Sequence, residues 1–444
     1  MFINHLKIAF RQILRYKFFS GLNILGLSLG MAVVLLIGLF IYQEYQYDRW
    51  MDESEDTYRV VRKRFGGGTA WTPSLLAQKL EQDYPEVAQA SGFSSAGEQL
   101  LSYAGNDLYI EHTAQVDSTF FQVLKMEFEV GNPATVLDAP NNMVITDRLA
   151  EKVFGNTNPI GEIVAYGGGE LFTITGLINT KAGPTHIPSD IFTRFTWYGN
   201  FWSGNNRLTY VRLKSKAGPD QLAQKIDAEV NAIIEREYRA DGYIPNKDDF
   251  FKWTLQPLNE VYLQSEGFTS ILYAKGSQRR VYILALIALL ILAVAVVNYV
   301  NLSTARASQR GREVGVKKVT GAGRGLLATQ FITESVVQAL IASGFALLIA
   351  ELTLPTFNRI MDRELLLLGD FSIILIPILL GLAILIGLLA GAYPAFVMSA
   401  FKPVTALKAK FLKNGEKSIF RKVLVTGQFT VSITLLIVMA FIYR

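Results

Sequence analysis

Long apolar runs alternate with polar stretches along this chain. The apolar runs cover residues 20–43, 281–302, 328–353, 371–394 and 423–443. Each approaches or exceeds the roughly 20 residues that an α-helix needs to cross the hydrocarbon core of a bilayer. The pattern therefore predicts a multi-pass α-helical membrane protein with a large α/β extracytoplasmic domain between the first and second transmembrane helices.

The polar stretch 44–280 carries short-period signals of a folded domain. "TYRVVRKRF", "MVIT", "LFTITGLI" and "LTYVRLKSK" are typical of strands, and "QLAQKIDAEVNAIIERE" is typical of an amphipathic helix. We expect Thr72 and Pro73 to begin a helix, and a second helix to run from Asp147 to Gly155. The glycine triplets 66–68 and 167–169 indicate hairpin turns.

The first 18 residues have an amphipathic pattern. Lys7, Arg11 and Arg15 recur every four residues. Leu6, Phe10, Ile13, Leu14 and Phe18 line another side. This favours a basic helix that lies along the inner membrane surface, although a simple topogenic flank has the same composition.

Basic residues set the expected orientation. Residues 1–18, 305–329 and 395–422 together hold 17 basic residues against two acids. By the positive-inside rule they are cytoplasmic, so residues 44–280 face the periplasm of a bacterial inner membrane. The expected parts are a cytoplasmic helix 1–18, transmembrane helices 19–43, 281–304, 328–353, 371–394 and 422–444, the domain 44–280, cytoplasmic segments 305–327 and 395–421, and a short external loop 354–370.

Candidate chemistry is sparse. The chain has no cysteine and only three scattered histidines, which argues against disulfides and metal sites. No catalytic constellation can be assembled, and the adjacent Asp248 and Asp249 favour a solvated turn. We expect no catalytic, cofactor-binding or metal-binding residue in this chain.

The predicted spans carry few polar features. Glu334 lies about two turns into the third apolar run, where it caps a packing site, faces a partner or snorkels to the interface. Small residues recur at a spacing of four at Gly26 and Gly30 and again at Gly387 and Gly391. Such pairs permit close packing of membrane helices.

A basic, glycine-rich segment separates the second and third spans. We expect residues 306–319 to form a short helix, since Glu313 and Lys317 stand four apart and Val316 and Val319 share an apolar stripe. Gly321 and Gly323 then permit a sharp turn. A transmembrane run precedes the glycines and no Gly-Lys-Ser/Thr follows them, so this is not a phosphate-binding loop.

The run "NLSTARASQRGREVGVKKVTGAGRGLLATQFITES" resembles the signature of the MacB/FtsX-like permeases of ABC transporters. Matching residues are Glu313, Gly315, Lys317, Lys318, Gly321, Ala322, Gln330, Phe331 and Glu334. "YPAFVMSAFKPVTALK" resembles the segment after the family's fourth span through Pro394, Ser399, Pro403, Ala406 and Leu407. "VDSTFFQVLKMEFEVGNP", "MVITDRLAEKVFGNTNPIGE" and "FTITGLI" resemble its MacB-like periplasmic core domain.

The resemblance implies a mechanotransmitting permease. It implies that an ABC-type ATPase acting in trans, with its own ATP and Mg²⁺, docks on the cytoplasmic coupling helix. The residues assigned to that docking are Arg312, Glu313, Val314, Gly315, Val316, Lys317, Lys318, Gly321, Ala322 and Arg324. Membrane lipid, a second permease copy or repeat half, and a periplasmic adaptor are further expected partners, and nucleic acid is not. Efflux or extraction is the expected task.

Residues 421–444 resemble the beginning of a second half in duplicated family members. The sequence is therefore expected to be part of a longer polypeptide or a form whose second half is lost.

A transmembrane sensor, whose external domain binds a ligand, is the main alternative to the transport function, and a membrane-bound hydrolase is a third. Reversing the charge at Glu313 or Lys318 is predicted to uncouple the docked ATPase without unfolding the external domain.

Overall fold

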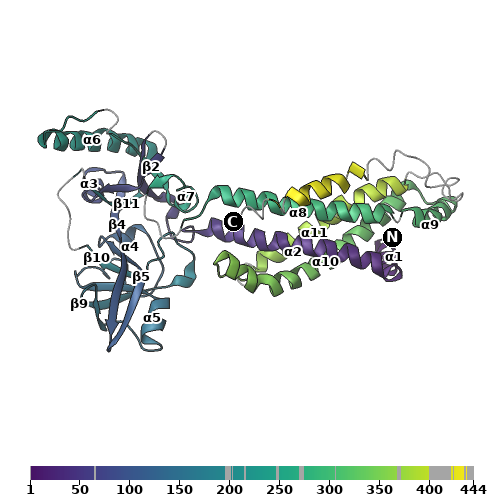
Figure 1. The fold of residues 1–444 in the computed structure, drawn as a ribbon, viewed down its shortest axis with the longest axis horizontal. Coiled ribbons are helices and arrows are strands. Elements are labelled where there is room, and N and C mark those ends of the chain that lie inside the picture. The colour runs from purple at the N-terminus through teal and green to yellow at the C-terminus, as the bar shows by residue number, and fades with distance from the viewer. Residues whose placement is uncertain are drawn as a thin grey trace. The chain divides into compact units, whose positions relative to one another are not determined.

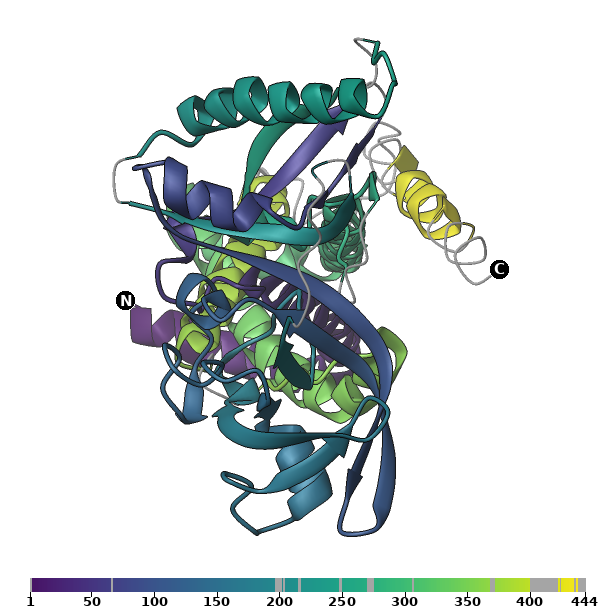
Figure 2. The same ribbon diagram turned by 90° about the vertical axis from the view of Figure 1, so that its left-hand side faces the viewer.

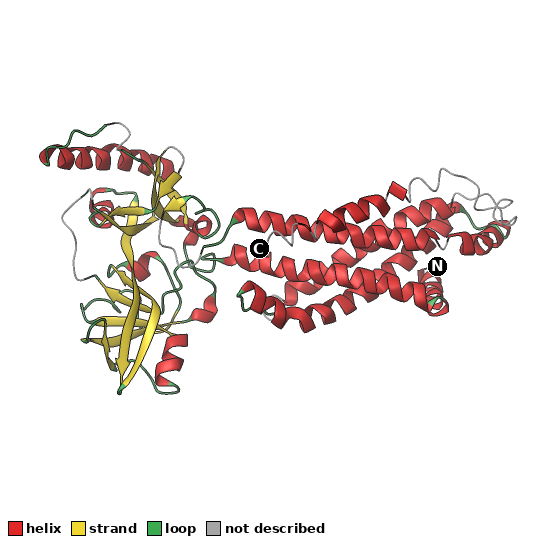
Figure 3. Ribbon diagram, viewed as in Figure 1, coloured by secondary structure: helices red, strands yellow, loops and turns green. Residues whose placement is uncertain are grey.

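The computed structural model describes residues 2–64, 67–195, 202, 204–214, 217–246, 250–269, 275–305, 307–367, 372–399, 422–423, 425–434 and 437. The chain divides into two compact units (Figures 1 and 3). The membrane unit comprises Met1–Tyr42 and Val281–Arg444, and the external unit comprises Gln43–Arg280.

The membrane unit is built of helices. They are α1 (Phe2–Arg15), α2 (Lys17–Gln46), α8 (Gln278–Ala305), α9 (Ala307–Val319), α10 (Arg324–Met361) and α11 (Ser372–Ser399). Four helical segments in the described part of the chain are long and apolar enough to cross a bilayer: Lys17–Gln46, Gln278–Thr304, Arg324–Met361 and Leu375–Phe396. The predicted fold class is confirmed. The fifth expected span, 422–444, is described only in part, mainly over residues 425–434.

The third span is longer than the sequence pattern predicts. Helix α10 continues past residue 353 and through Pro355, so the expected external loop 354–370 is helical as far as Met361. The helix ends at Asp362, which adopts a left-handed conformation (φ 51°). The Asn358 side chain then holds Leu365 by hydrogen bonds in both directions. These bonds close the turn that follows the end of the helix.

Helix α1 packs on α10 through one face and leaves other apolar side chains exposed. Ala9 is fully buried, whereas Phe10 and Leu14 are exposed, as is Phe18 at the start of α2. An amphipathic helix with exposed aromatic and aliphatic side chains has the form of an interfacial segment.

Small residues line the contact between α10 and α11. Ala339, Ala342, Ala346 and Ala350 are fully buried along α10. A Cβ atom at Gly387 would lie 2.5 Å from the Cα atom of Val336, and one at Gly391 would lie 2.8 Å from the Cβ atom of Ser335. In α2, a Cβ atom at Gly30 would lie 2.8 Å from that of Ala295, and one at Gly26 would lie 3.4 Å from the Asn298 side chain. Three of these four glycines therefore stand where a side chain does not fit.

The external unit is a mixed sheet with helices packed against it. Its described strands are β1 (Thr57–Arg64), β2 (Gly67–Thr69), β3 (Trp71–Pro73), β4 (Val87–Tyr103), β5 (Asn106–Val116), β6 (Phe128–Val130), β7 (Asn142–Thr146), β8 (Ile163–Tyr166), β9 (Glu170–Ile178), β10 (Ile191–Arg194), β11 (Asn205–Leu213), β12 (Lys252–Pro257) and β13 (Phe268–Thr269). The order is β13-β2-β1-β11-β4-β5-β10-β7-β9-β6, with β12 on β1, β3 on β11 and β8 on β4 and β9.

The helices of this unit are α3 (Leu76–Asp83), α4 (Phe120–Val123), α5 (Asp147–Phe154), α6 (Pro219–Ala240) and α7 (Leu258–Val261), with 3₁₀ turns at Ser54–Asp56 and Thr180–Ala182. Figure 2 shows the long β4–β5 hairpin running along the unit, with α6 and α5 towards its opposite ends. Separate apolar clusters lie under α6 and α3, under α5, and around α4.

Most local expectations for this unit are confirmed. Strand β7 leads into α5, which Thr146 caps by accepting a hydrogen bond from the Leu149 amide. Gly167 to Gly169 turn the β8–β9 hairpin with positive φ at all three residues. Asp248 and Asp249 lie outside the described residues.

The expected helix start at Thr72 and Pro73 is wrong. Both residues belong to β3, which pairs with β11, and α3 begins only at Leu76. The Thr72 hydroxyl hydrogen-bonds the Arg207 carbonyl and the Thr209 hydroxyl instead of capping a helix. Pairing with a strand distant in sequence therefore overrides the local capping signal.

Candidate coupling site

The candidate site is an elbow formed by α9 and the turn Thr320–Gly323 that joins it to α10. The amides of Thr320, Gly321 and Ala322 bond the carbonyls of Val316, Lys318 and Lys317, which closes the end of α9. Gly321 has φ of 96°, a conformation that glycine adopts without strain. Helix α10 then begins after Gly323. The elbow predicted from the glycine pattern is present.

A polar network connects the elbow to two other helices. Glu313 in α9 accepts from the Gln12 side-chain amide of α1 at 3.3 Å and pairs with Lys317 at 2.9 Å. Lys317 also donates to the Gln330 side chain of α10 at 3.0 Å. Gln330 in turn donates to Glu334 at 2.9 Å. We call these five residues the elbow network, and it joins α1, α9 and α10.

Lys318 connects the elbow to α11. Its Nζ atom donates to the Ser399 carbonyl at 2.6 Å. Partial burial, together with the nearby positive charge of Arg324, lowers the pKa of Lys318. Each of the two adjacent lysines thus bonds a different helix.

An apolar cluster supports the same joint. Val314 of α9, Leu327 and Phe331 of α10 and Ala395 of α11 are buried together, with Ala322 packed against them. Gly315 is also buried. Displacing α9 would therefore break apolar contacts as well as hydrogen bonds.

The exposed side of the described part of α9 is apolar. Val316 and Val319 are 54% and 66% exposed. Thr320, Gly321 and Arg324 are exposed beside them. The spacing of Glu313 and Lys317 suggests a charged outer face, but the structure turns this pair towards α1 and α10. The side chain of Arg312 lies outside the described residues.

Glu334 is buried within α10, with 4% of its surface exposed. It accepts the hydrogen bond from Gln330 one turn earlier. The next residue, Ser335, shares a buried hydrogen bond of 2.9 Å with the Tyr299 hydroxyl of α8. Glu334 therefore belongs to the packed interior, which favours the packing interpretation over an interfacial carboxylate.

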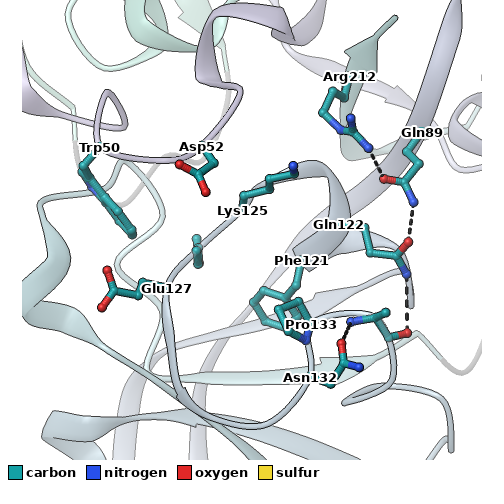
Figure 4. A pocket seen from close by; sticks show the side chains of 12 residues that line it. Trp50, Asp52, Gln89, Phe121, Gln122, Lys125, Glu127, Asn132, Pro133 and Arg212 are labelled. Atoms are coloured by element: carbon teal, nitrogen blue, oxygen red, sulfur yellow. Dashed lines mark hydrogen bonds between the residues drawn. The ribbon is translucent and has the colours of Figure 1, made fainter.

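The external unit contains a pocket of about 510 Å³. Trp50, Phe121, Met126 and Pro133 supply apolar walls (Figure 4). A row of hydrogen bonds runs along the wall beside Phe121, from Arg212 to Gln89 at 2.6 Å, then to Gln122 and the Ala134 carbonyl. Glu53 pairs with Lys125 at 2.8 Å and Arg212 at 2.6 Å, and these cations lower the pKa of its carboxyl group. The size is that of a small-ligand site.

Two family models match this chain. The MacB-like periplasmic core domain matches residues 20–229, and the FtsX-like permease C-terminal domain matches residues 285–403. The first match takes in most of the external unit, and the second contains the whole elbow. The chain belongs to the MacB/FtsX-like family of ABC transporter permeases.

This permease covers different fractions of its relatives' sequences. The uncharacterized ABC transporter permease YknZ of Bacillus subtilis is 22% identical over 426 residues, which is 91% of this chain and 99% of YknZ. The macrolide export ATP-binding/permease protein MacB of Bdellovibrio bacteriovorus is 23% identical, covering 91% of this chain and 62% of that protein. MacB of Mannheimia succiniciproducens is 22% identical, with coverages of 71% and 46%. The permease therefore spans about half the length of these MacB relatives.

Solved structures of two external domains also match this permease. The periplasmic region of MacB from Actinobacillus actinomycetemcomitans gives a TM-score of 0.32 at 13% identity, over 48% of this chain and 92% of that structure. The extracellular domain of the ABC-type transporter YknZ from Gram-positive bacteria gives 0.31 at 17% identity, over 45% and 99%.

Sequence reasoning found the elbow of this permease but missed several residues that hold it. Gln12, Gln330 and Ser399 were not assigned to the site, yet each bonds an α9 side chain. The spacing of Gln330 and Glu334, one helical turn apart, was an available signal. No local pattern connects Gln12 or Ser399 with α9, because each meets α9 only in the folded bundle.

Proposed function

We propose that this permease couples ATP hydrolysis by a partner ATPase to movement of its external domain. The ATPase binds ATP and Mg²⁺ itself and docks on the elbow from the cytoplasm. The external domain lies in the periplasm, and the spans lie in a bacterial inner membrane. Its movement serves export or extraction of a substrate from the membrane or periplasm, in an assembly with a second permease copy or repeat half and a periplasmic adaptor.

The observation that carries this proposal is the attachment of α9 to three other helices. Glu313 bonds α1, Lys317 bonds α10 and Lys318 bonds α11. A helix held only by flexible loops would absorb a displacement locally. Because α9 is bonded and packed on several sides, a displacement reaches the helices that hold it.

The same observation separates two roles within the elbow. Glu313, Lys317 and Lys318 hold α9 in place, whereas Val316 and Val319 are open to a partner. Exposed apolar side chains flanked by polar ones are typical of protein contact sites. We therefore assign direct ATPase contact to Val316, Val319 and the adjacent Arg324.

The test is reconstitution with the ABC-type ATPase that co-purifies with the chain. Val316→Asp is expected to reduce binding of that ATPase and permease-stimulated ATP turnover at least tenfold, since it places a charge at the contact. Leu171→Asp is the matched control, because Leu171 is an exposed aliphatic residue of the external unit. Equal binding and turnover in both variants and the unaltered chain would refute the docking assignment.

A transmembrane sensor is a second candidate, favoured by the pocket between Trp50 and Arg212. A sensor would respond to a ligand in this pocket without a stimulated ATPase. Absence of any co-purifying ATPase, together with ligand-dependent changes at the elbow, would support the sensor over the transporter.

A further inference from the structure

The segment that follows the first span is held by buried polar groups of the external unit. Asp48 comes just after α2, is fully buried, and has a left-handed backbone with φ of 62°. Its carboxylate accepts from the Thr185 hydroxyl at 2.8 Å and the His186 amide at 3.2 Å. Its other oxygen meets the His186 ring Nδ1 at 2.7 Å. Its own amide donates to the Pro184 carbonyl at 3.0 Å.

The contact continues from His186 into the sheet. The other ring nitrogen of His186 lies 2.7 Å from the Tyr210 hydroxyl in β11. Tyr210 pairs in register with Arg59 of β1, a fully buried guanidinium that bonds Gln256 of β12 at 2.7 Å. Burial raises the pKa of Tyr210, so its hydroxyl keeps its proton for this chain of contacts. We call Asp48, His186, Tyr210 and Arg59 the Asp48 network.

Further contacts hold this segment and the one that precedes α8. The Trp50 indole donates to the Pro184 carbonyl at 2.8 Å and packs where Gly183 has no side chain. The rings of Tyr47 and Tyr262 stack with centroids 3.4 Å apart. The Tyr262 hydroxyl donates to Glu44 at 2.9 Å, and its carbonyl accepts from Gly276, just before α8. Both segments that connect the external unit to the spans are therefore bonded within it.

We infer that Asp48, His186 and Tyr210 are positioning residues that fasten the end of the first span to the sheet of the external domain. The inference rests on the proposed function, since it states where that domain receives the movement. A shift of Asp48 is passed to the loop 183–187 that leads to β10 and, through Tyr210 and Arg59, to β11, β1 and β12.

The cost of this arrangement supports a role beyond packing. An ionisable residue away from water requires full hydrogen bonding, and a left-handed non-glycine residue is strained. A buried ionisable group and a strained backbone persist only where the surrounding contacts enforce them. Apolar residues of similar volume would fill the space more simply, but they would not lock one orientation of the connecting segment.

The test uses the full chain with its ATPase and measures hydrogen exchange of backbone amides. Tyr210→Phe and His186→Gln are the test variants, and Tyr84→Phe is the matched control. Tyr84 is also buried, and its hydroxyl bonds Glu229 at 2.8 Å away from the connecting segments. Asp48→Asn is the conservative variant, because asparagine tolerates the left-handed conformation and keeps an acceptor for Thr185 and His186.

We expect the amides of Asp48 and His186 to exchange about tenfold faster in Tyr210→Phe and His186→Gln than in the Tyr84→Phe control, as one buried hydrogen bond is lost. The change in external-domain exchange between the nucleotide-free and ATP-bound states should shrink at least threefold in these variants and persist in Asp48→Asn. ATPase binding should stay as in the unaltered chain.

Unchanged exchange at Asp48 and His186, or a full ATP response despite faster exchange there, would overturn the inference. Failure of the proposed function gives a different result. In that case the unaltered chain itself shows no ATP-dependent change in its external domain, while the local effect of Tyr210→Phe is still observed.

Discussion

The elbow network and the Asp48 network both fasten a chain segment beside a span, but they do so in different surroundings. Side chains of Glu313 and Lys317 are each about one-third exposed, whereas those of Asp48 and His186 are fully buried. Water competes for the bonds of Glu313 and Lys317 and weakens them, while nothing competes for the Asp48 contacts. The elbow can therefore adjust to a partner, and the Asp48 network holds one geometry.

This difference suggests a division of labour along the permease. A surface that binds and releases a partner benefits from bonds that re-form easily. A joint that passes on displacement benefits from bonds whose loss is costly.

Asp48→Ala should have the largest effect on stability. It leaves His186 without its carboxylate in a buried site and places alanine at positive φ, so we expect a loss of about 3–5 kcal/mol in the free energy of unfolding of the external unit. Denaturant unfolding of the full chain in detergent, followed by tryptophan fluorescence, measures it. Asp48→Asn should recover most of the loss, and equal midpoints for Asp48→Ala and the unaltered chain would contradict the prediction.

Gly387→Ala should have the next largest effect, because the new Cβ atom would lie 2.5 Å from the backbone of α10. Helices α10 and α11 would have to separate, at a cost of about 1–3 kcal/mol. Thermal unfolding of the purified chain measures this loss. Gly381→Ala is the matched control, since a Cβ atom at Gly381 meets nothing within 4 Å. Similar melting temperatures for both variants would show that α10 and α11 accommodate the added methyl group without separating.

Glu313→Lys should affect coupling more than stability. It breaks the bonds to Gln12 and Lys317, and the loss of one partly exposed ion pair costs about 0.2–1 kcal/mol. We expect binding of the partner ATPase and its stimulated turnover to fall severalfold while the external unit stays folded. Lys318→Glu, which replaces the donor to Ser399 with an acceptor, should act in the same direction.

Glu235→Lys is the matched control for Glu313→Lys. Glu235 pairs with Arg239 at the same spacing on α6 of the external unit, at 2.7 Å. If ATPase binding and turnover fall equally in both variants, the elbow ion pair has no special role.

Raising the pH should produce the smallest effect. The pKa of Lys318 is lowered by burial and by Arg324, so Lys318 loses its proton at a lower pH than an ordinary lysine. The folded state then binds fewer protons than the unfolded state between the two pKa values, and the contribution of this group to stability rises slightly with pH in that window. The pH profile of amine-specific labelling at Lys318, read by mass spectrometry, should have its midpoint below that of a free lysine. A midpoint at or above that of a free lysine would show that burial and Arg324 do not act on Lys318 in this way.

Much of this architecture could be predicted from short stretches of sequence, because the features that identify a span or a turn lie within the segment itself. Apolar runs long enough for a bilayer and the glycine turns at 167–169 and 321 need no distant partner to be recognised. Capping signals were less reliable. Helix α5 begins at Asp147 as predicted, whereas Thr72, the predicted start of another helix, pairs with the distant strand β11 and bonds it through its hydroxyl.

The candidate site divides in the same way. The motif around Glu313, Gly315 and Lys317 located the elbow but did not show which side of α9 meets the other helices. A spacing of four residues places Glu313 and Lys317 on one side of a helix without indicating whether that side meets water or protein. Only the positions of α1, α10 and α11 show that the charged side faces inward and that Val316 and Val319 face outward.

The sequence alone therefore determined the number of apolar helices in the described part, the place of the external domain between the first two, and the elbow, because each follows from spacing along the chain. The tertiary structure decided which polar groups meet. Asp48 and Arg59 lie far along the chain from His186 and Tyr210, and no local pattern links the two pairs. Strand register and the loop 183–187 bring them together, and their burial makes the contacts strong.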